Sequence, residues 1–400
     1  MKRLLLFIFI LTLSYASMAQ KKEISQAKEY VKKGTNLDTA EKLMTTLLKD
    51  SANRKNEKIW NVLFDAVSKQ YDQGNEKLYL KQKYDTASLF VLGRKMFSIL
   101  ESLDSLDMKP DSKGRVKLKY REKNAEFLNG YRANLFNGGA YFISKHNYRD
   151  AYDFFNAYLD CAQQPLFSRY KYSETDKRIP QAAYWAVYCG YKLKDTKMTL
   201  RHTYLALKDT SHYNYMLQFL ADTYKLEDDT VRYVGALTEG FEKYPLFPYF
   251  FPRLIEYYTK KGDFDMAMKI ADKALAVDST NTVFRFAKST VLLNVGKYAE
   301  CISICDALIA KNDSLADAYL NAGLAYFNQA VELDKMTQAS QKRKQKILSY
   351  YEKAMPYMQK YRALAPTQKE KWSIPLYTIY LNLNMGKEFD EIDKIIRNKN

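Results

Sequence analysis

The chain has 400 residues, with 63 lysines and arginines against 46 aspartates and glutamates, and a formal net charge of +17. Only 14 glycines, 9 prolines and 4 cysteines occur, which excludes a loop-rich fold held together by a framework of disulfides. Apolar residues recur at helical spacing almost throughout, so we expect helices and no strands.

Residues 1–19 have the three parts of a secretory signal peptide. A basic start precedes an apolar core over 4–13, and the small residues Ser17 and Ala19 follow. This core is too short for a membrane-spanning helix, which needs about 20 apolar residues, and no later segment is a better candidate. We therefore predict cleavage after Ala19 and a periplasmic or secreted protein with no transmembrane segment in its mature chain. Loss of the two basic residues of the signal lowers the formal charge from +17 to +15.

The pattern over residues 20–178 predicts irregular helical repeats. Two units and a long helix over 76–102 precede a clearer unit, and an insertion of about 14 residues follows it before the next unit begins. The apolar and small residues that carry these units are Ala27, Ala40, Leu47, Trp60, Leu63, Phe64, Val67, Leu135, Gly139, Phe142, Tyr148, Ala151 and Phe155.

Residues 179–400 predict a regular array in which the same pattern returns every 34 residues. The clearest unit consists of Phe251, Leu254, Tyr258, Gly262, Phe264, Ala267, Ala271 and Ala274. A step of 34 residues forward gives Leu292, Gly296, Tyr298, Cys301 and Cys305, and a step back gives Leu217, Leu220, Ala221 and Tyr224. An insertion near 333–350 interrupts the array, and Pro356 is expected to kink or interrupt the helix that follows.

This pattern resembles the tetratricopeptide repeat family, and with the signal peptide it resembles an exported bacterial member. The resemblance implies an all-α solenoid in which antiparallel helix pairs stack into a superhelix. One pair cannot bury its own apolar face, so each pair is stabilised by packing against the next.

The four cysteines are expected to be buried thiols. Cys301 and Cys305 lie one helical turn apart, where Cβ atoms are about 5–6 Å apart, whereas a disulfide needs about 3.5–4.5 Å. Cys161 and Cys189 lie on helices of adjacent units, so a bridge between them stays open as the alternative.

The sequence predicts no catalytic residue, cofactor or metal site. Only three histidines occur, without the spacing of a zinc helix, and no glycine-rich phosphate loop is present. Gly138 and Gly139 occupy the position where the family packs two helices closely, so we interpret them as packing residues. An enzyme with an unrecognised site is the third hypothesis for the function.

The resemblance implies where a partner binds. In the family, the second, fifth, ninth and twelfth positions of each first helix point into a groove. Those positions give Gln181, Tyr184, Tyr188, Tyr191, Tyr215, Gln218, Asp222, Lys225, Tyr249 and Glu256. The leading hypothesis is a scaffold that binds a protein or peptide there, since tyrosine offers a flat apolar face with a polar edge. The alternative is an envelope protein that binds a glycan or another polyanion through its positive charge, and nucleic acid is not expected as a partner of an exported protein.

Overall fold

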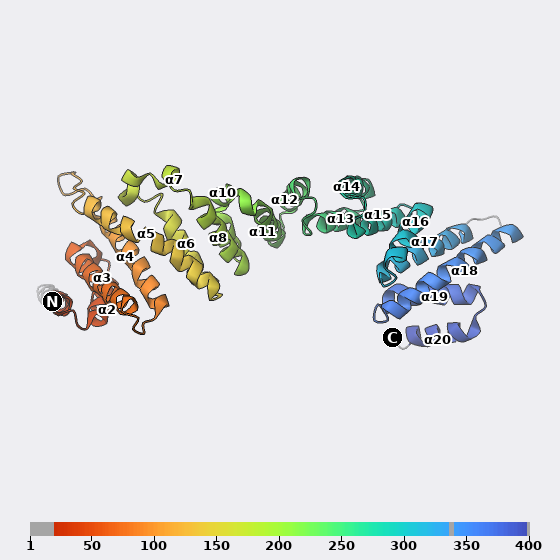
Figure 1. Ribbon diagram of the computed structural model, residues 1–400, viewed down its shortest axis with the longest axis horizontal. Helices are drawn as coiled ribbons and strands as arrows, with labels where there is room; N and C mark the ends of the chain where they lie inside the picture. Colours follow the sequence, from red (N-terminus) through yellow and green to blue (C-terminus); the bar gives the residue numbers. More distant parts are fainter. Residues whose placement is uncertain (1–19, 336–339, 398–400) are drawn as a thin grey trace, which may run out of the picture. The chain divides into compact units, whose positions relative to one another are not determined.

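The computed structural model describes residues 20–335 and 340–397, and every regular element among them is a helix (Figure 1). The prediction of an all-α fold is confirmed, while the predicted signal peptide lies outside the described residues. The chain forms two compact units, unit 1 up to Thr230 and unit 2 from Val231. The division predicted at 178/179 concerns the regularity of the repeats and stays a prediction.

In unit 1 the longer helices pack against their neighbours along the chain. After a helix over residues 20–33, its helices are α2 (Leu37–Leu47), α3 (Glu57–Tyr79), α4 (Thr86–Asp107), α5 (Arg121–Ser144), α6 (Tyr148–Asp160), α7 (Tyr172–Thr175), α8 (Ile179–Lys192), α9 (Thr196–Arg201), α10 (Thr203–Ala206) and α11 (Tyr213–Leu226). Short 3-10 turns lie at η1 (Asn53–Lys55), η2 (Pro165–Tyr170) and η3 (Thr210–His212). Beyond these sequential contacts, α8 also touches α11, so the first helices of successive pairs meet.

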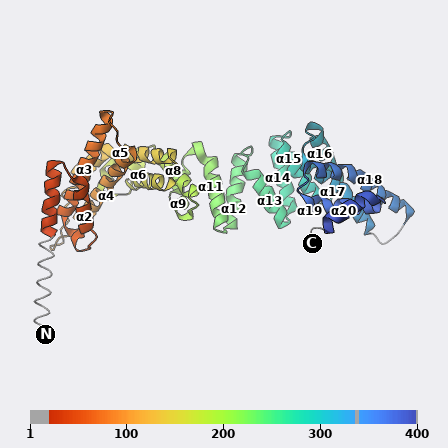
Figure 2. The ribbon, with the colours of Figure 1, turned by 90° about the horizontal axis from the view of Figure 1, so that it is seen from below.

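Unit 2 repeats the same arrangement (Figure 2). Its helices are α12 (Thr230–Lys243), α13 (Phe250–Lys261), α14 (Phe264–Val277), α15 (Thr282–Asn294), α16 (Tyr298–Lys311), α17 (Ala316–Asp334), α18 (Gln341–Leu364), α19 (Lys369–Asn382) and α20 (Gly386–Arg397). The first helices α13, α15, α17 and α19 contact one another in succession. The predicted solenoid of stacked helix pairs is therefore confirmed within each unit.

The turns inside the pairs show the repeat period directly in the backbone. Lys194, Asp228, Gly262 and Gly296 each have a positive φ, and each lies 34 residues after the one before. A residue in the left-handed region ends one helix and lets the chain reverse into the next. At Gly262 the following residue, Asp263, caps α14 by accepting a hydrogen bond from the Met266 amide.

Close helix contacts depend on glycine. A Cβ at Gly138 would lie 2.7 Å from the Phe154 ring, and one at Gly139 would lie 2.6 Å from the Phe155 ring. At Gly190 the nearest atom would be the Thr199 backbone nitrogen, at 2.5 Å. The interpretation of the Gly138-Gly139 pair as packing residues is confirmed.

Both predicted insertions occur, although residues 336–339 of the longer one lie outside the described residues. The longer one extends the α17–α18 hairpin. Because α18 continues through Pro356 as one helix, the expected interruption is wrong, and a kink at this proline stays a prediction. Proline removes one backbone hydrogen bond, but α18 contacts α17 on both sides of it, since the Tyr351 ring lies 5.9 Å from that of Phe327 and Met358 packs onto Gly323. The other insertion forms η2 and α7, which are anchored by the Arg132 guanidinium.

Arg132 is buried between two aromatic rings of unit 1. Its guanidinium lies 3.9 Å from the ring centroids of both Tyr158 and Tyr172, and it donates to Asp176 Oδ2 at 2.6 Å. Tyr158 donates to the same carboxylate oxygen at 2.6 Å. A buried charge is tolerated where it is paired and hydrogen-bonded, so this network fixes the insertion against α5 and α6.

The four cysteines are buried free thiols, as predicted. Burial raises the pKa of Cys189 to about 12, which keeps this thiol protonated at neutral pH. The alternative of a Cys161–Cys189 bridge does not occur in this structure. None of the helices in the described part of the chain has the length and apolar character to cross a membrane.

Candidate functional site

Aromatic side chains of α8 and α11 gather around Phe219 in unit 1. We call Phe219 with Tyr184, Tyr188, Tyr191 and Tyr215 the Phe219 cluster. The ring centroid of Phe219 lies 4.4 Å from that of Tyr191, 5.9 Å from Tyr188, 6.1 Å from Tyr184 and 6.5 Å from Tyr215. All four tyrosines are among the predicted groove residues, so the fold brings them together.

The members of the cluster differ in how far a ligand can reach them. Tyr184 is only 5% exposed, because it stacks on His212 at 4.2 Å between ring centroids, and burial raises its pKa to about 12. Tyr188 and Tyr191 are half-buried, and Tyr215 is exposed. Tyr184 therefore contributes to packing, while the other three tyrosines present part of their rings to solvent.

A pocket of about 560 Å³ opens beside this cluster, at the ends of α8 and α11 and the start of α9. It is lined by Tyr191, Lys192, Lys194, Thr196, Thr199, Asp222, Thr223, Lys225 and Leu226. Its volume lies in the range of about 300–1,000 Å³ that is typical of ligand sites. Three of the predicted groove residues, Tyr191, Asp222 and Lys225, line it.

The turn after α8 places the basic side chains of the pocket. Lys194 adopts a left-handed conformation with a φ of 55°, and Asp195 then caps α9 by accepting from the Met198 amide at 2.9 Å. The turn thereby brings Lys194 to the pocket that Lys192 of α8 and Lys225 of α11 also line.

The pocket combines apolar walls with a positive balance of charge. Three lysines face one aspartate, Asp222, whose Oδ2 accepts a hydrogen bond from the Tyr191 hydroxyl at 3.0 Å. The Tyr191 ring and the Leu226 side chain supply apolar surface, and the aliphatic stems of the lysines add to it. Such a lining suits a ligand that joins an apolar group to a negative charge.

The remaining predicted residues of unit 1 lie at the same helices. Gln181 is exposed in the first turn of α8, and Gln218 is half-buried on α11. Neither side chain is part of the lining of the pocket, so their role in binding stays a prediction.

The last two predicted residues belong to unit 2. Tyr249 is 7% exposed, with the Arg253 guanidinium 3.7 Å from its ring centroid, so it is a packing residue. Glu256 is exposed on α13 and pairs with Lys260 at 2.6 Å. It borders a second pocket of about 370 Å³ between α13 and α15.

This second pocket has apolar walls, and most of its residues were not predicted from the sequence. It is lined by Phe251, Pro252, Ile255, Glu256, Thr259, Lys260, Val283, Phe286, Ala287 and Thr290. One further step of 34 residues from Tyr249, Pro252 and Glu256 would have reached its α15 side, at Val283, Phe286 and Thr290. Phe219 was missed for another reason, since it lies between two helices and not at a position assigned to the groove.

The described residues offer little for metal-dependent chemistry. In this part of the chain no group of three or more histidine, cysteine, aspartate and glutamate side chains is placed to hold a metal ion. That the chain is no enzyme stays a prediction.

Comparisons with known proteins give matches to proteins with the same type of repeat. No protein-family model matches the chain. Hsp70-Hsp90 organizing protein 2 of Arabidopsis thaliana is 29% identical over 96 residues, which are 24% of this chain and 17% of that protein. This chain therefore spans only a small part of that relative's length.

Two solved structures extend this likeness at low identity. The C-terminal part of a TPR repeat-containing protein from Cytophaga hutchinsonii is 13% identical, with a TM-score of 0.45 over 65% of this chain and 93% of the other. The complex of the TPR2AB domain of yeast Sti1 with pHSP90 is 15% identical, with a TM-score of 0.25 over 82% of this chain and 98% of the other.

Proposed function

We propose that this chain, which consists of tetratricopeptide-type helix pairs, is a scaffold that binds a protein partner through an extended peptide segment. The observation that carries this proposal is the pocket of about 560 Å³ beside the Phe219 cluster, with apolar walls and three lysines. Tyrosine rings give large contact area at a low cost in side-chain entropy, so they suit a peptide surface.

The lining also indicates which peptide would bind. An apolar side chain would fill the space beside Tyr191 and Leu226, and a neighbouring carboxylate would be attracted to the lysines. A peptide with an acidic residue next to an aliphatic or aromatic residue fits both features. Charge alone would favour an anionic glycan as well, and the apolar walls favour the peptide.

The experiment is a screen of the full mature chain against an array of peptides, followed by affinity measurements on the peptides that bind. We expect Lys194→Glu combined with Lys225→Glu to weaken binding about tenfold or more, since about 1.4 kcal/mol corresponds to a tenfold change. Fluorescence anisotropy of a labelled peptide measures this directly. Lys109→Glu combined with Lys117→Glu is the matched control, because it makes the same change of charge at two exposed lysines elsewhere in unit 1.

A salt titration separates the peptide from a polyanion. Affinity for a peptide held partly by apolar contact should fall only modestly between low and moderate salt, whereas affinity for a sulfated glycan should collapse. If the control variant lost as much peptide affinity as the Lys194→Glu, Lys225→Glu variant, the proposed site would be contradicted. Binding of glycan alone would favour the alternative function.

We also propose that the chain is exported, on the basis of the signal pattern in residues 1–19. The expected outcome is a mature protein that begins at Gln20. Intact mass and N-terminal sequencing of the protein from its own cells would test this, and a protein that retains residues 1–19 inside the cell would contradict it.

A further inference from the structure

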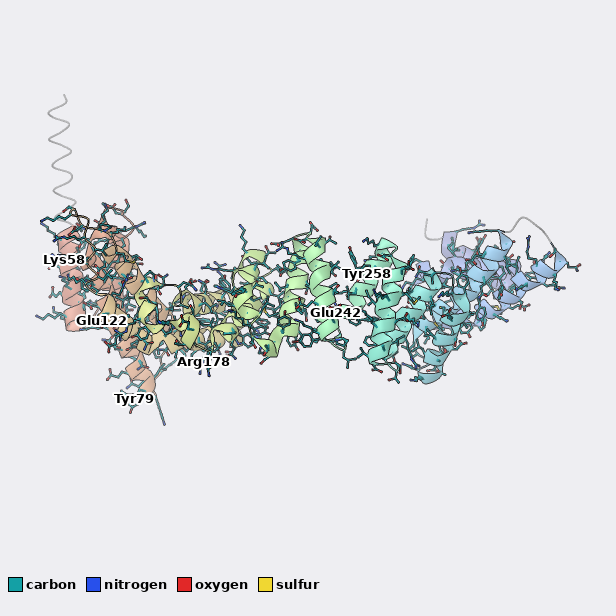
Figure 3. The ribbon with its side chains drawn as sticks, turned by 90° about the horizontal axis from the view of Figure 1, so that it is seen from above. Lys58, Tyr79, Glu122, Arg178, Glu242 and Tyr258 are labelled. Atoms are coloured by element: carbon teal, nitrogen blue, oxygen red, sulfur yellow. The ribbon has the colours of Figure 1, made fainter. Side chains whose placement is uncertain are left out.

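The turn between α3 and α4 exposes two adjacent apolar side chains. Tyr79, the last residue of α3, is 85% exposed, and Leu80 is 55% exposed. Figure 3 shows Tyr79 at the end of its helix, pointing away from the helices beside it. We call residues 77–83 the α3–α4 tip. At this exposure the Tyr79 side chain contributes little to packing, and more than half of the Leu80 side chain faces solvent.

Local structure fixes the shape of the tip. Lys81 adopts a left-handed conformation with a φ of 57°, and the Gln82 amide donates to the Lys77 carbonyl at 2.8 Å, which closes the end of α3. Behind the turn Tyr84 packs over Gly74, where a Cβ would lie 2.6 Å from the tyrosine ring. A well-defined turn therefore holds Tyr79 and Leu80 in an outward orientation.

The tip is also positively charged. Lys77, Lys81 and Lys83 are all exposed, and residues 77–83 contain no aspartate or glutamate, while Glu76 and Asp85 flank them. The Lys77 ammonium lies 5.8 Å from the centroid of the Tyr84 ring, so one cation stays at the base of the tip. Two exposed apolar side chains thus lie in a short segment that also exposes three lysines.

We infer that the α3–α4 tip attaches the protein reversibly to an anionic lipid surface. Tyrosine favours the headgroup region of a membrane, where its ring is apolar and its hydroxyl stays wet, and lysine stems lie along apolar surface while their ammonium groups meet anionic headgroups. A negatively charged leaflet attracts basic segments within a Debye length of its surface.

A protein pocket fits this tip less well. A stable protein interface buries roughly 800 Å² on each partner around a dry centre. The α3–α4 tip exposes only two large apolar side chains next to lysines, which a soft lipid surface accommodates more easily than a rigid protein surface. Attachment through so small a surface is weak and reversible.

The test uses the full mature chain and lipid vesicles in a sedimentation assay. We expect partition onto phosphatidylcholine vesicles that contain phosphatidylglycerol, and little partition onto phosphatidylcholine alone. Tyr79→Ser combined with Leu80→Ser should lower the partition coefficient about tenfold, because attachment that rests on few apolar groups is marginal. Lys81→Gln combined with Lys83→Gln should lower it on the anionic vesicles and remove most of its salt dependence.

Tyr204→Ser is the matched control, because Tyr204 is also highly exposed and also has a lysine, Lys208, over its ring at 4.5 Å. It should bind vesicles as the unmodified protein does. As a direct reading of insertion, an environment-sensitive dye attached at Leu80→Cys should brighten and shift to the blue on anionic vesicles. The inference is overturned if the double serine variant partitions like the control, or if the dye reports no change. Capture of another protein by the tip, without partition onto vesicles, would overturn it equally.

Discussion

At the residue scale, one carboxyl group of unit 1 is poised to titrate near neutral pH. Burial, and then the negative charge of Asp160, raise the pKa of Glu101 from 4.5 to about 7. Asp160 is itself hydrogen-bonded, since its Oδ2 accepts from the Asn156 amide at 2.7 Å and its Oδ1 accepts from Arg201 at 3.4 Å. The sequence does not predict this interaction, because Glu101 and Asp160 lie 59 positions apart on different helices.

The raised pKa of Glu101 predicts a pH dependence of stability. Between pH 4.5 and about 7 the native protein keeps a proton that the unfolded chain has lost, so the free energy of unfolding falls as pH rises through this window. Above that window Glu101 should cause no further change in the free energy of unfolding with pH. Glu101→Gln should remove this slope and, above the window, stabilise the protein by about 1–3 kcal/mol, since one pKa unit corresponds to about 1.4 kcal/mol and partial exposure reduces the effect.

Urea unfolding of the unmodified and Glu101→Gln proteins across this range of pH measures the difference between their slopes. Other carboxyl groups titrate in both proteins and cancel in the comparison. Equal slopes would show that Glu101 ionises without cost in the native state.

At the element scale, the 34-residue period predicts the turns inside the helix pairs but not their residue types. Gly262 and Gly296 can be recognised in the sequence as turn glycines. Lys194 and Asp228 adopt the same left-handed conformation although neither is a glycine. The sequence could place these turns by register alone. At Pro356 the expectation of an interrupted helix failed because the packing of α18 on α17 outweighed local propensity.

Two glycines of unit 2 should respond to alanine in opposite directions. Gly262 has a φ of 76°, so Gly262→Ala should destabilise the protein by about 1–2 kcal/mol through backbone strain alone. Gly235 lies inside α12, and a Cβ there would meet nothing within 4 Å. Gly235→Ala should therefore stabilise by about 0.5–1 kcal/mol, because alanine loses less entropy than glycine when a helix forms. Thermal unfolding followed by circular dichroism measures both changes, and shifts of the same sign would contradict this account.

At the scale of the whole molecule, the sequence predicts the type of fold better than it predicts the site. The period of apolar and small residues fixes the stacked helix pairs, and it brings four predicted tyrosines to one cluster. It does not predict Phe219 at their centre, because positional rules describe one helix face and Phe219 lies between helices. It also gives no sign of the boundary after Thr230, since Asp228 and Gly262 continue the 34-residue step across it.

The two compact units predict two separable unfolding transitions. In a repeat protein each pair is stabilised by its neighbours, so damage to one unit should spread little into the other. A Cβ at Gly190 of unit 1 would lie 2.5 Å from the Thr199 nitrogen, and one at Gly240 of unit 2 would lie 2.3 Å from the Phe250 ring. Crowding of this kind costs about 1–3 kcal/mol, and each kcal/mol lowers the midpoint by about 2–4 °C in a unit of this size.

Calorimetry of the full chain should therefore show Gly190→Ala and Gly240→Ala lowering different transitions. Hydrogen exchange read by mass spectrometry assigns each transition, because the amides of α8 and α9 should lose protection in the first variant and those of α12 and α13 in the second. If instead both variants lower one common transition, the repeats unfold as a single cooperative array. The division after Thr230 would then have no consequence for stability.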